Sequence, residues 1–83
     1  MKLSELQKGE SGQVTDILCD EKTAVRLKRI GLTEGVKVTA IRRAPLGDPI
    51  EIKIRDFFLA IRLSDAEKIE LAPPTDKTSG DKP

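Results

Sequence analysis

The fold is decided by residues 36–63, which read VKVTAIRRAPLGDPIEIKIRDFFLAIRL. Apolar and polar side chains alternate in three runs of this stretch, whose apolar members are Val36, Val38 and Ala40, then Ile50, Ile52 and Ile54, then Leu59, Ile61 and Leu63. Because successive side chains of a strand point to opposite faces, each run predicts a strand with one buried face. The links between the runs are short, so we expect an antiparallel meander.

A strand and a helix should precede this meander. Residues 12–18 alternate loosely around two β-branched side chains and predict the strand. The helix should begin after Asp20 as its N-cap and end at Gly31, since glycine readily takes the left-handed conformation that closes a helix. Its apolar stripe comprises Ala24, Leu27 and Ile30, and Leu32 supplies the apolar contact beyond its end.

Two short turns and a last strand complete the expected pattern. Ser4 should cap a turn that ends at Gly9, and Ser64 should cap a single helical turn before a strand near Ile69 and Leu71. Many short strands with one helix predict an all-β protein, curled into a small barrel that removes its sheet edges. The 83 residues suffice for one domain, over residues 1–71. The proline-rich residues 72–83 should form a disordered tail.

Composition excludes several kinds of chemistry. The chain has no histidine and a single cysteine, Cys19, so neither an internal disulfide nor the usual zinc ligand sets can be assembled. Catalytic triads that need an imidazole base are also excluded. We therefore expect a non-enzymatic protein with no cofactor, no metal site and no small-molecule substrate. No apolar run is long enough to span a bilayer and no signal peptide precedes the domain, so we expect a soluble, cytoplasmic protein without membrane insertion.

Positive charge gathers in the middle of the chain. Residues 22–43 carry seven lysines and arginines against one acidic residue, although the formal net charge of the chain is +1. On the predicted helix, Lys22, Arg26 and Arg29 recur at helical spacing and share one face. This face is either an ordinary solvated surface or the binding surface for an acidic partner.

The loop between the first two strands of the meander is the second candidate for function. It reads RRAPLGDP over residues 42–49, and its prolines fix φ at both ends while Gly47 can take a positive φ and Asp48 can bond locally to the backbone. The loop should therefore be rigid. Leu46 either folds over the barrel end or projects as an apolar contact.

These two segments resemble the FeoA family. The similarity is carried by residues 26–35 (RLKRIGLTEG), 44–50 (APLGDPI) and 59–62 (LAIR), and it extends from Leu3 to Leu71. The resemblance implies an SH3-like β-barrel that serves as a small cytosolic accessory protein of bacterial ferrous iron uptake, with the membrane GTPase transporter FeoB as its partner. Similar domains occur in metal-dependent repressors. At residues 55–56 the chain has Arg-Asp where Arg-Gly is commoner in the family, and we expect Asp56 to tolerate left-handed geometry there.

We expect the partner to bind the loop and the basic helix. The residues expected at the contact are Arg42, Arg43, Leu46 and Asp48, with Arg26 and Arg29 behind them. One alternative is a stand-alone basic barrel that binds nucleic acid or acts as the repressor-type SH3-like domain. The scarcity of aromatic residues disfavours base stacking, and we expect no nucleic acid partner. A weaker alternative is an arginine, Arg42 or Arg43, supplied to the GTPase of the partner.

Overall fold

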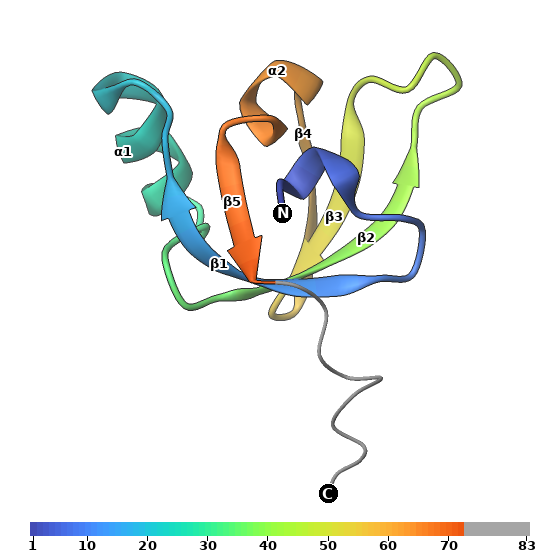
Figure 1. The fold of residues 1–83 in the computed structure, drawn as a ribbon, viewed down its shortest axis with the longest axis horizontal. Coiled ribbons are helices and arrows are strands. Elements are labelled where there is room, and N and C mark those ends of the chain that lie inside the picture. The colour runs from blue at the N-terminus through green and yellow to red at the C-terminus, as the bar shows by residue number, and fades with distance from the viewer. Residues whose placement is uncertain (73–83) are drawn as a thin grey trace, which may run out of the picture.

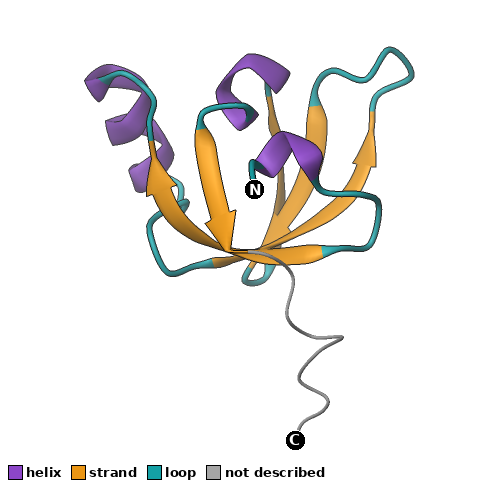
Figure 2. Cartoon of the chain, viewed as in Figure 1, coloured by secondary structure: helices purple, strands orange, loops and turns teal. Residues whose placement is uncertain are grey.

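The computed structural model describes residues 1–72 and contains one antiparallel sheet in the order β4-β3-β2-β1-β5 (Figure 1). Its strands are β1 (Ser11–Ile17), β2 (Lys37–Arg43), β3 (Ile50–Ile54), β4 (Phe57–Ile61) and β5 (Ile69–Ala72). The helices are the 3-10 helix η1 (Leu3–Glu5), α1 (Glu21–Arg29) and α2 (Leu63–Ala66). The sheet curls around a common interior, with α1, α2 and the β2–β3 loop at its upper end in Figure 2. The predicted meander and the order of elements are confirmed. Ala72 ends β5, and the rest of the expected tail lies outside the described residues.

The core follows the predicted alternation in β2 and β3. Val36, Val38 and Ala40 are buried, and so are Ile50, Ile52 and Ile54. The third predicted run differs, because Leu59 is only partly buried and Leu63 begins α2 instead of ending a strand. Leu3 and Leu6 from the N-terminal turn fill the same core cluster. No polar or charged residue within residues 1–72 is buried. The polar and charged side chains of residues 1–72 that could bind a partner therefore lie at the surface of the domain.

The end of α1 forms as the sequence predicts. The Gly31 amide donates to the Lys28 carbonyl at 3.0 Å, and the Leu32 amide donates to the Leu27 carbonyl at 3.0 Å. This pair of bonds is a Schellman motif, and Gly31 adopts the expected positive φ of 99°. Leu32 is fully buried, whereas Ile30 remains 39% exposed and does not complete the predicted apolar stripe.

Asp20 is the N-cap residue of α1, as predicted, although its side chain makes no capping hydrogen bond. The other two predicted caps differ from the structure. Ser4 lies inside η1, whose N-cap is Lys2, and Ser64 lies inside α2, whose N-cap is Arg62. A serine hydroxyl can accept from a free amide at a helix start, but a carboxylate can satisfy that amide instead. In η1 the Glu5 carboxylate accepts from the Lys2 amide at 2.7 Å.

The β3–β4 turn also differs in detail. Arg55 adopts a positive φ of 54°, whereas Asp56 was expected to take the left-handed conformation. In a two-residue hairpin the first turn residue has a positive φ in both favoured turn types, and Arg55 occupies that position between Ile54 and Phe57. The turn therefore holds a residue that has a Cβ atom in a backbone conformation that is unfavourable for it.

A β-bulge at Ile41 sets the direction of two arginines. The register between β2 and β3 shifts between Ala40 and Arg42, so Ile41 has no partner on β3. Strict alternation would turn Arg42 toward the side of buried Ala40. After the bulge, Arg43 instead shares the inner face with its partner Ile50, and Arg42 lies on the outer face with Glu51.

Candidate docking surface

The β2–β3 loop is held at its base and presents Leu46 to solvent. The Ala44 amide donates to the Pro49 carbonyl at 3.0 Å, and the Gly47 amide donates to the Ala44 carbonyl at 2.7 Å. Gly47 has a φ of 87°, as predicted for this turn. Leu46 is 96% exposed, the highest value among the exposed large hydrophobic residues in residues 1–72. Of the two predicted orientations of Leu46, the projecting one is present.

Asp48 ties this loop to α2. Its Oδ1 atom accepts a hydrogen bond from the Leu63 amide at 2.9 Å. Leu63 is the first residue of α2, so the carboxylate satisfies one of the free amides at a helix start. Asp48 was expected to bond locally, and it bonds instead to a residue 15 positions away. Sequence spacing could not show this contact because it depends on how the sheet curls.

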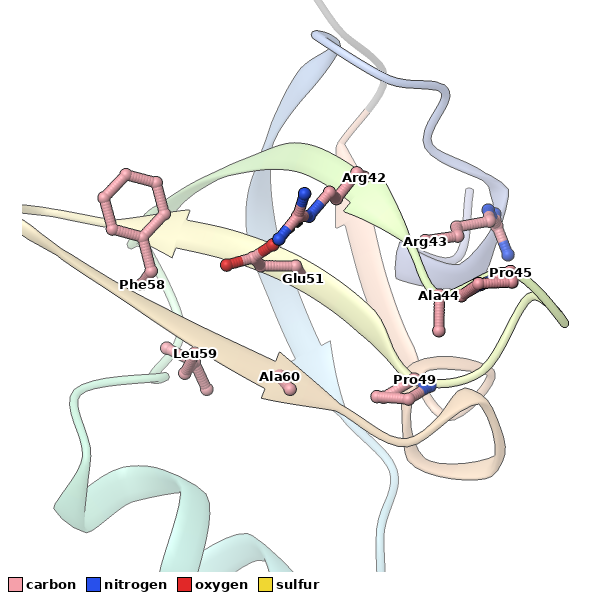
Figure 3. Close-up of a pocket in the computed structure, with 9 residues that line it drawn as sticks. All are labelled: Arg42, Arg43, Ala44, Pro45, Pro49, Glu51, Phe58, Leu59 and Ala60. Atoms are coloured by element: carbon pink, nitrogen blue, oxygen red, sulfur yellow. Dashed lines mark hydrogen bonds and ion pairs between the residues drawn. The ribbon is translucent and has the colours of Figure 1, made fainter.

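The two arginines at the start of the loop are engaged within the molecule. Arg42 Nε donates to Glu51 Oε1 at 2.7 Å across the outer face of the sheet. Arg43 Nη2 donates to the carbonyl oxygens of Ser4 and Leu6, and its side chain turns toward the N-terminal segment in Figure 3. Arg43 therefore fastens the N-terminal turn to the end of β2, while Arg42 takes part in a surface ion pair.

A shallow groove adjoins the loop on the outer face of the sheet (Figure 3). Its volume is about 610 Å³, and its walls are Pro45 and Pro49 of the loop, the Arg42–Glu51 pair, and Phe58 and Ala60 of β4. Phe58 is 55% exposed, and Lys53 Nζ lies 5.7 Å from the centre of its ring. The groove thus combines apolar side chains with a satisfied ion pair. Phe58 and Ala60 were not among the predicted site residues, because the alternation of the third run of the meander indicates a strand that faces the core.

The basic face of α1 lies apart from the loop. Lys22, Arg26 and Arg29 line a second groove with Glu21 and with Val25, which is 44% exposed. Arg26 Nη2 lies 3.8 Å from Asp65 Oδ2, a weak contact for an ion pair. Figure 1 shows α1 on one flank of the molecule and the β2–β3 loop on the opposite flank. The structure therefore does not bring Arg26 and Arg29 together with Leu46. The sequence could have indicated that Val25 shares this face of α1, since it follows Lys22 by three residues.

Cys19 lies in a setting that disfavours a thiolate. The side chain is partly buried and its Sγ atom is 4.0 Å from the Asp65 carbonyl oxygen. Burial, followed by the negative charge of Asp65, raises the pKa of the Cys19 thiol above its ordinary value of 9.0. Within residues 1–72 no three cysteine, aspartate or glutamate side chains gather closely enough to hold a metal ion. None of the helices in the described part of the chain is long and apolar enough to cross a membrane.

Comparison with known proteins identifies the family. The profile of the FeoA domain family matches residues 1–73. The chain belongs to the FeoA family. The FeoA protein of Chlorobium tepidum has a similar structure, with 38% identity and a TM-score of 0.85 over 99% of this chain and 74% of that one. The zinc-complexed FeoA of Stenotrophomonas maltophilia, a prokaryotic SH3-domain protein, shows 26% identity and a TM-score of 0.75 over 87% of this chain and 89% of that one. The fold is therefore an SH3-like barrel.

Two further relatives place the FeoA domain within longer proteins. A Porphyromonas gingivalis fusion of Fe(2+) transport protein A with the Fe(2+) transporter FeoB is 32% identical over 71 residues. This match covers 86% of the present chain and 8% of the fusion protein. A manganese-dependent transcriptional repressor has a TM-score of 0.77 at 17% identity, over 88% of this chain and 41% of that one, and it shares the fold alone.

Proposed function

We propose that this FeoA-family chain is a non-enzymatic accessory domain of ferrous iron transport, which docks on the cytosolic part of a FeoB-type transporter. The observation that carries this proposal is a fully exposed leucine, Leu46, at the tip of a loop fixed at both ends. Holding an apolar side chain in water in a fixed conformation reduces the entropy lost on binding. The fusion of such a domain with FeoB in Porphyromonas gingivalis supports the choice of partner.

Within this proposal the six residues expected from the sequence divide into three roles. Leu46 is the apolar contact, while Asp48, Arg42 and Arg43 bond to acceptors or donors within their own molecule. Arg26 and Arg29 offer a second, basic contact on the opposite flank. A partner that touches both flanks must wrap around the barrel, or the two surfaces must bind different parts of the transporter.

The structure gives less support to the alternative functions. Both arginines that could serve as a catalytic finger for a GTPase already donate to acceptors within this domain. The basic residues between positions 22 and 43 are divided between two elements, α1 and β2. A nucleic acid backbone is bound best by a contiguous basic surface, so this division disfavours that function.

Titration calorimetry with the soluble cytosolic region of a FeoB-type transporter tests the proposal. We expect Leu46→Asp to weaken binding by at least about tenfold, because central apolar contacts dominate binding energy. Leu18→Asp is the matched control, since Leu18 is also exposed, at 57%, but lies outside the loop. For the basic face, Arg29→Glu is compared with Lys28→Glu, which makes the same charge change on another face of α1. Unchanged binding in Leu46→Asp would refute the docking surface.

A further inference from the structure

The two edges of the sheet differ in whether another segment of the chain covers them. β5 and β4 are the edge strands in the order β4-β3-β2-β1-β5. The edge of β5 is covered by the chain start, where the Met1 amine donates to the Leu71 carbonyl at 3.0 Å and the Leu71 amide donates to the Met1 carbonyl at 2.6 Å. No other segment of residues 1–72 pairs with the outer side of β4, which is the outermost strand in Figure 3. One edge is therefore covered and the other is open.

β4 also lacks the features that usually prevent edge strands from pairing. Its sequence, FFLAI, has no charged residue and no proline, and its register with β3 runs without a bulge. Phe57 is 41% exposed and Phe58 is 55% exposed. Edge strands of soluble monomers are ordinarily protected by lysine, proline or bulges. An unprotected apolar edge of five residues is suited to pair with another strand.

We propose that β4 pairs with β4 of a second copy of this chain, antiparallel and about a two-fold axis at Leu59, to form a homodimer. Charge complementarity selects this partner and this register. Asp56 immediately precedes the strand and Arg62 immediately follows it. With the axis at Leu59, Asp56 of each copy lies opposite Arg62 of the other, so the two ends of the interface each carry a pair of opposite charges.

The side chains within the strand fit the same register. Phe58 of one copy lies opposite Ala60 of the other, so that each large ring faces a small side chain on the outer face. A shift of the axis by one residue places Asp56 opposite Ser64 or opposite Ala60 and loses both charge pairs. The formal net charge of +1 adds little repulsion between two copies.

The expected dimer is weak. A stable interface buries about 800 Å² on each partner, and one added strand of five residues supplies less. We therefore expect a dissociation constant between about 10 and about 500 µM, the range of transient association. The dimer interface does not include Leu46, although it shares Phe58 and Ala60 with the groove beside the loop. The Leu46→Asp binding test and the test of the dimer can therefore fail independently.

The dimer is tested by exchanging the charges at positions 56 and 62 and measuring sedimentation velocity over a concentration series. We expect Asp56→Arg and Arg62→Asp each to raise the dissociation constant about tenfold, because each variant opposes like charges at both ends of the interface. The double variant should restore dimerisation to within about threefold, since it exchanges the charges without removing the pairs. Glu34→Arg changes the net charge as Asp56→Arg does, on an exposed turn outside β4, and should leave the dimer unchanged.

Two measurements test the proposed dimer and its register. Circular dichroism confirms that each variant is folded, and amide shifts recorded from about 20 µM to about 1 mM should change with concentration along β4. A protein that stays monomeric at about 1 mM overturns the proposal. So does a double variant that fails to restore association, or concentration-dependent shifts that lie away from β4.

Discussion

Removal of the Asp48 carboxylate tests whether the loop is held by its contact with α2. In Asp48→Ala the Leu63 amide loses its acceptor at 2.9 Å, and the loop loses its tie to a residue 15 positions away. Because Asp48 is exposed, the value for a helix cap applies in place of the larger value for a buried charged bond, so we expect a loss of about 1 kcal/mol in the free energy of unfolding. In a domain of this size that loss lowers Tm by about 4–8 °C.

Urea unfolding followed by far-ultraviolet circular dichroism measures this loss, since the chain has no tryptophan or tyrosine to report by fluorescence. Asp48→Asn keeps an oxygen acceptor without the charge and should lose about half as much. Glu34→Ala is the control, because Glu34 is another exposed turn carboxylate and lies outside both the loop and β4. If Asp48→Ala unfolds at the same urea concentration as Glu34→Ala, the carboxylate does not fasten the loop.

Three further predictions concern stability and reactivity. Arg43→Ala should lower the free energy of unfolding by about 1.5 kcal/mol, because the charged hydrogen bonds of Arg43 tie η1 to β2. Arg42→Ala removes only a surface ion pair and should lower it by less than about 1 kcal/mol. Equal losses for the two variants in urea unfolding would contradict this distinction. Arg55→Gly should stabilise the domain by about 1 kcal/mol, measured by thermal unfolding, since glycine adopts the positive φ of 54° without strain. Burial raises the pKa of Cys19, so the fraction of thiolate at a given pH is smaller in the folded protein, and alkylation by iodoacetamide should reach its half-maximal rate at a higher pH than in urea; coincident pH profiles would contradict this.

Local patterns predicted the elements of this fold. Period-two alternation identified β2 and β3, and glycine at position 31 identified the end of α1. Both signals depend on residues close together in the chain, where backbone geometry alone decides the outcome. The predicted rigidity of the β2–β3 loop has the same origin, since its closing bonds join residues within positions 44–49.

Contacts between distant residues could not be read from the same patterns. The Asp48–Leu63 bond and the bonds of Arg43 to the N-terminal turn form only when the sheet curls. Ser4 and Ser64 were favoured as caps by local preference, but a carboxylate from outside the segment satisfied α2. The bulge at Ile41 had no signature in the sequence and reversed the faces on which Arg42 and Arg43 lie.

The bulge also explains why a loop with so many polar neighbours presents an apolar tip. It directs Arg43 inward to the N-terminal turn and Arg42 outward to Glu51, so neither guanidinium group remains free beside Leu46. The charges around the loop are thus used to hold it, and the leucine at its tip is left for contact. Among the residues proposed for docking, the basic charges available to attract a partner lie on α1 on the opposite flank, where Arg29 lies. Salt should therefore weaken the contribution of Arg29 and leave that of Leu46 nearly unchanged, because surface charges are screened while apolar contacts are not.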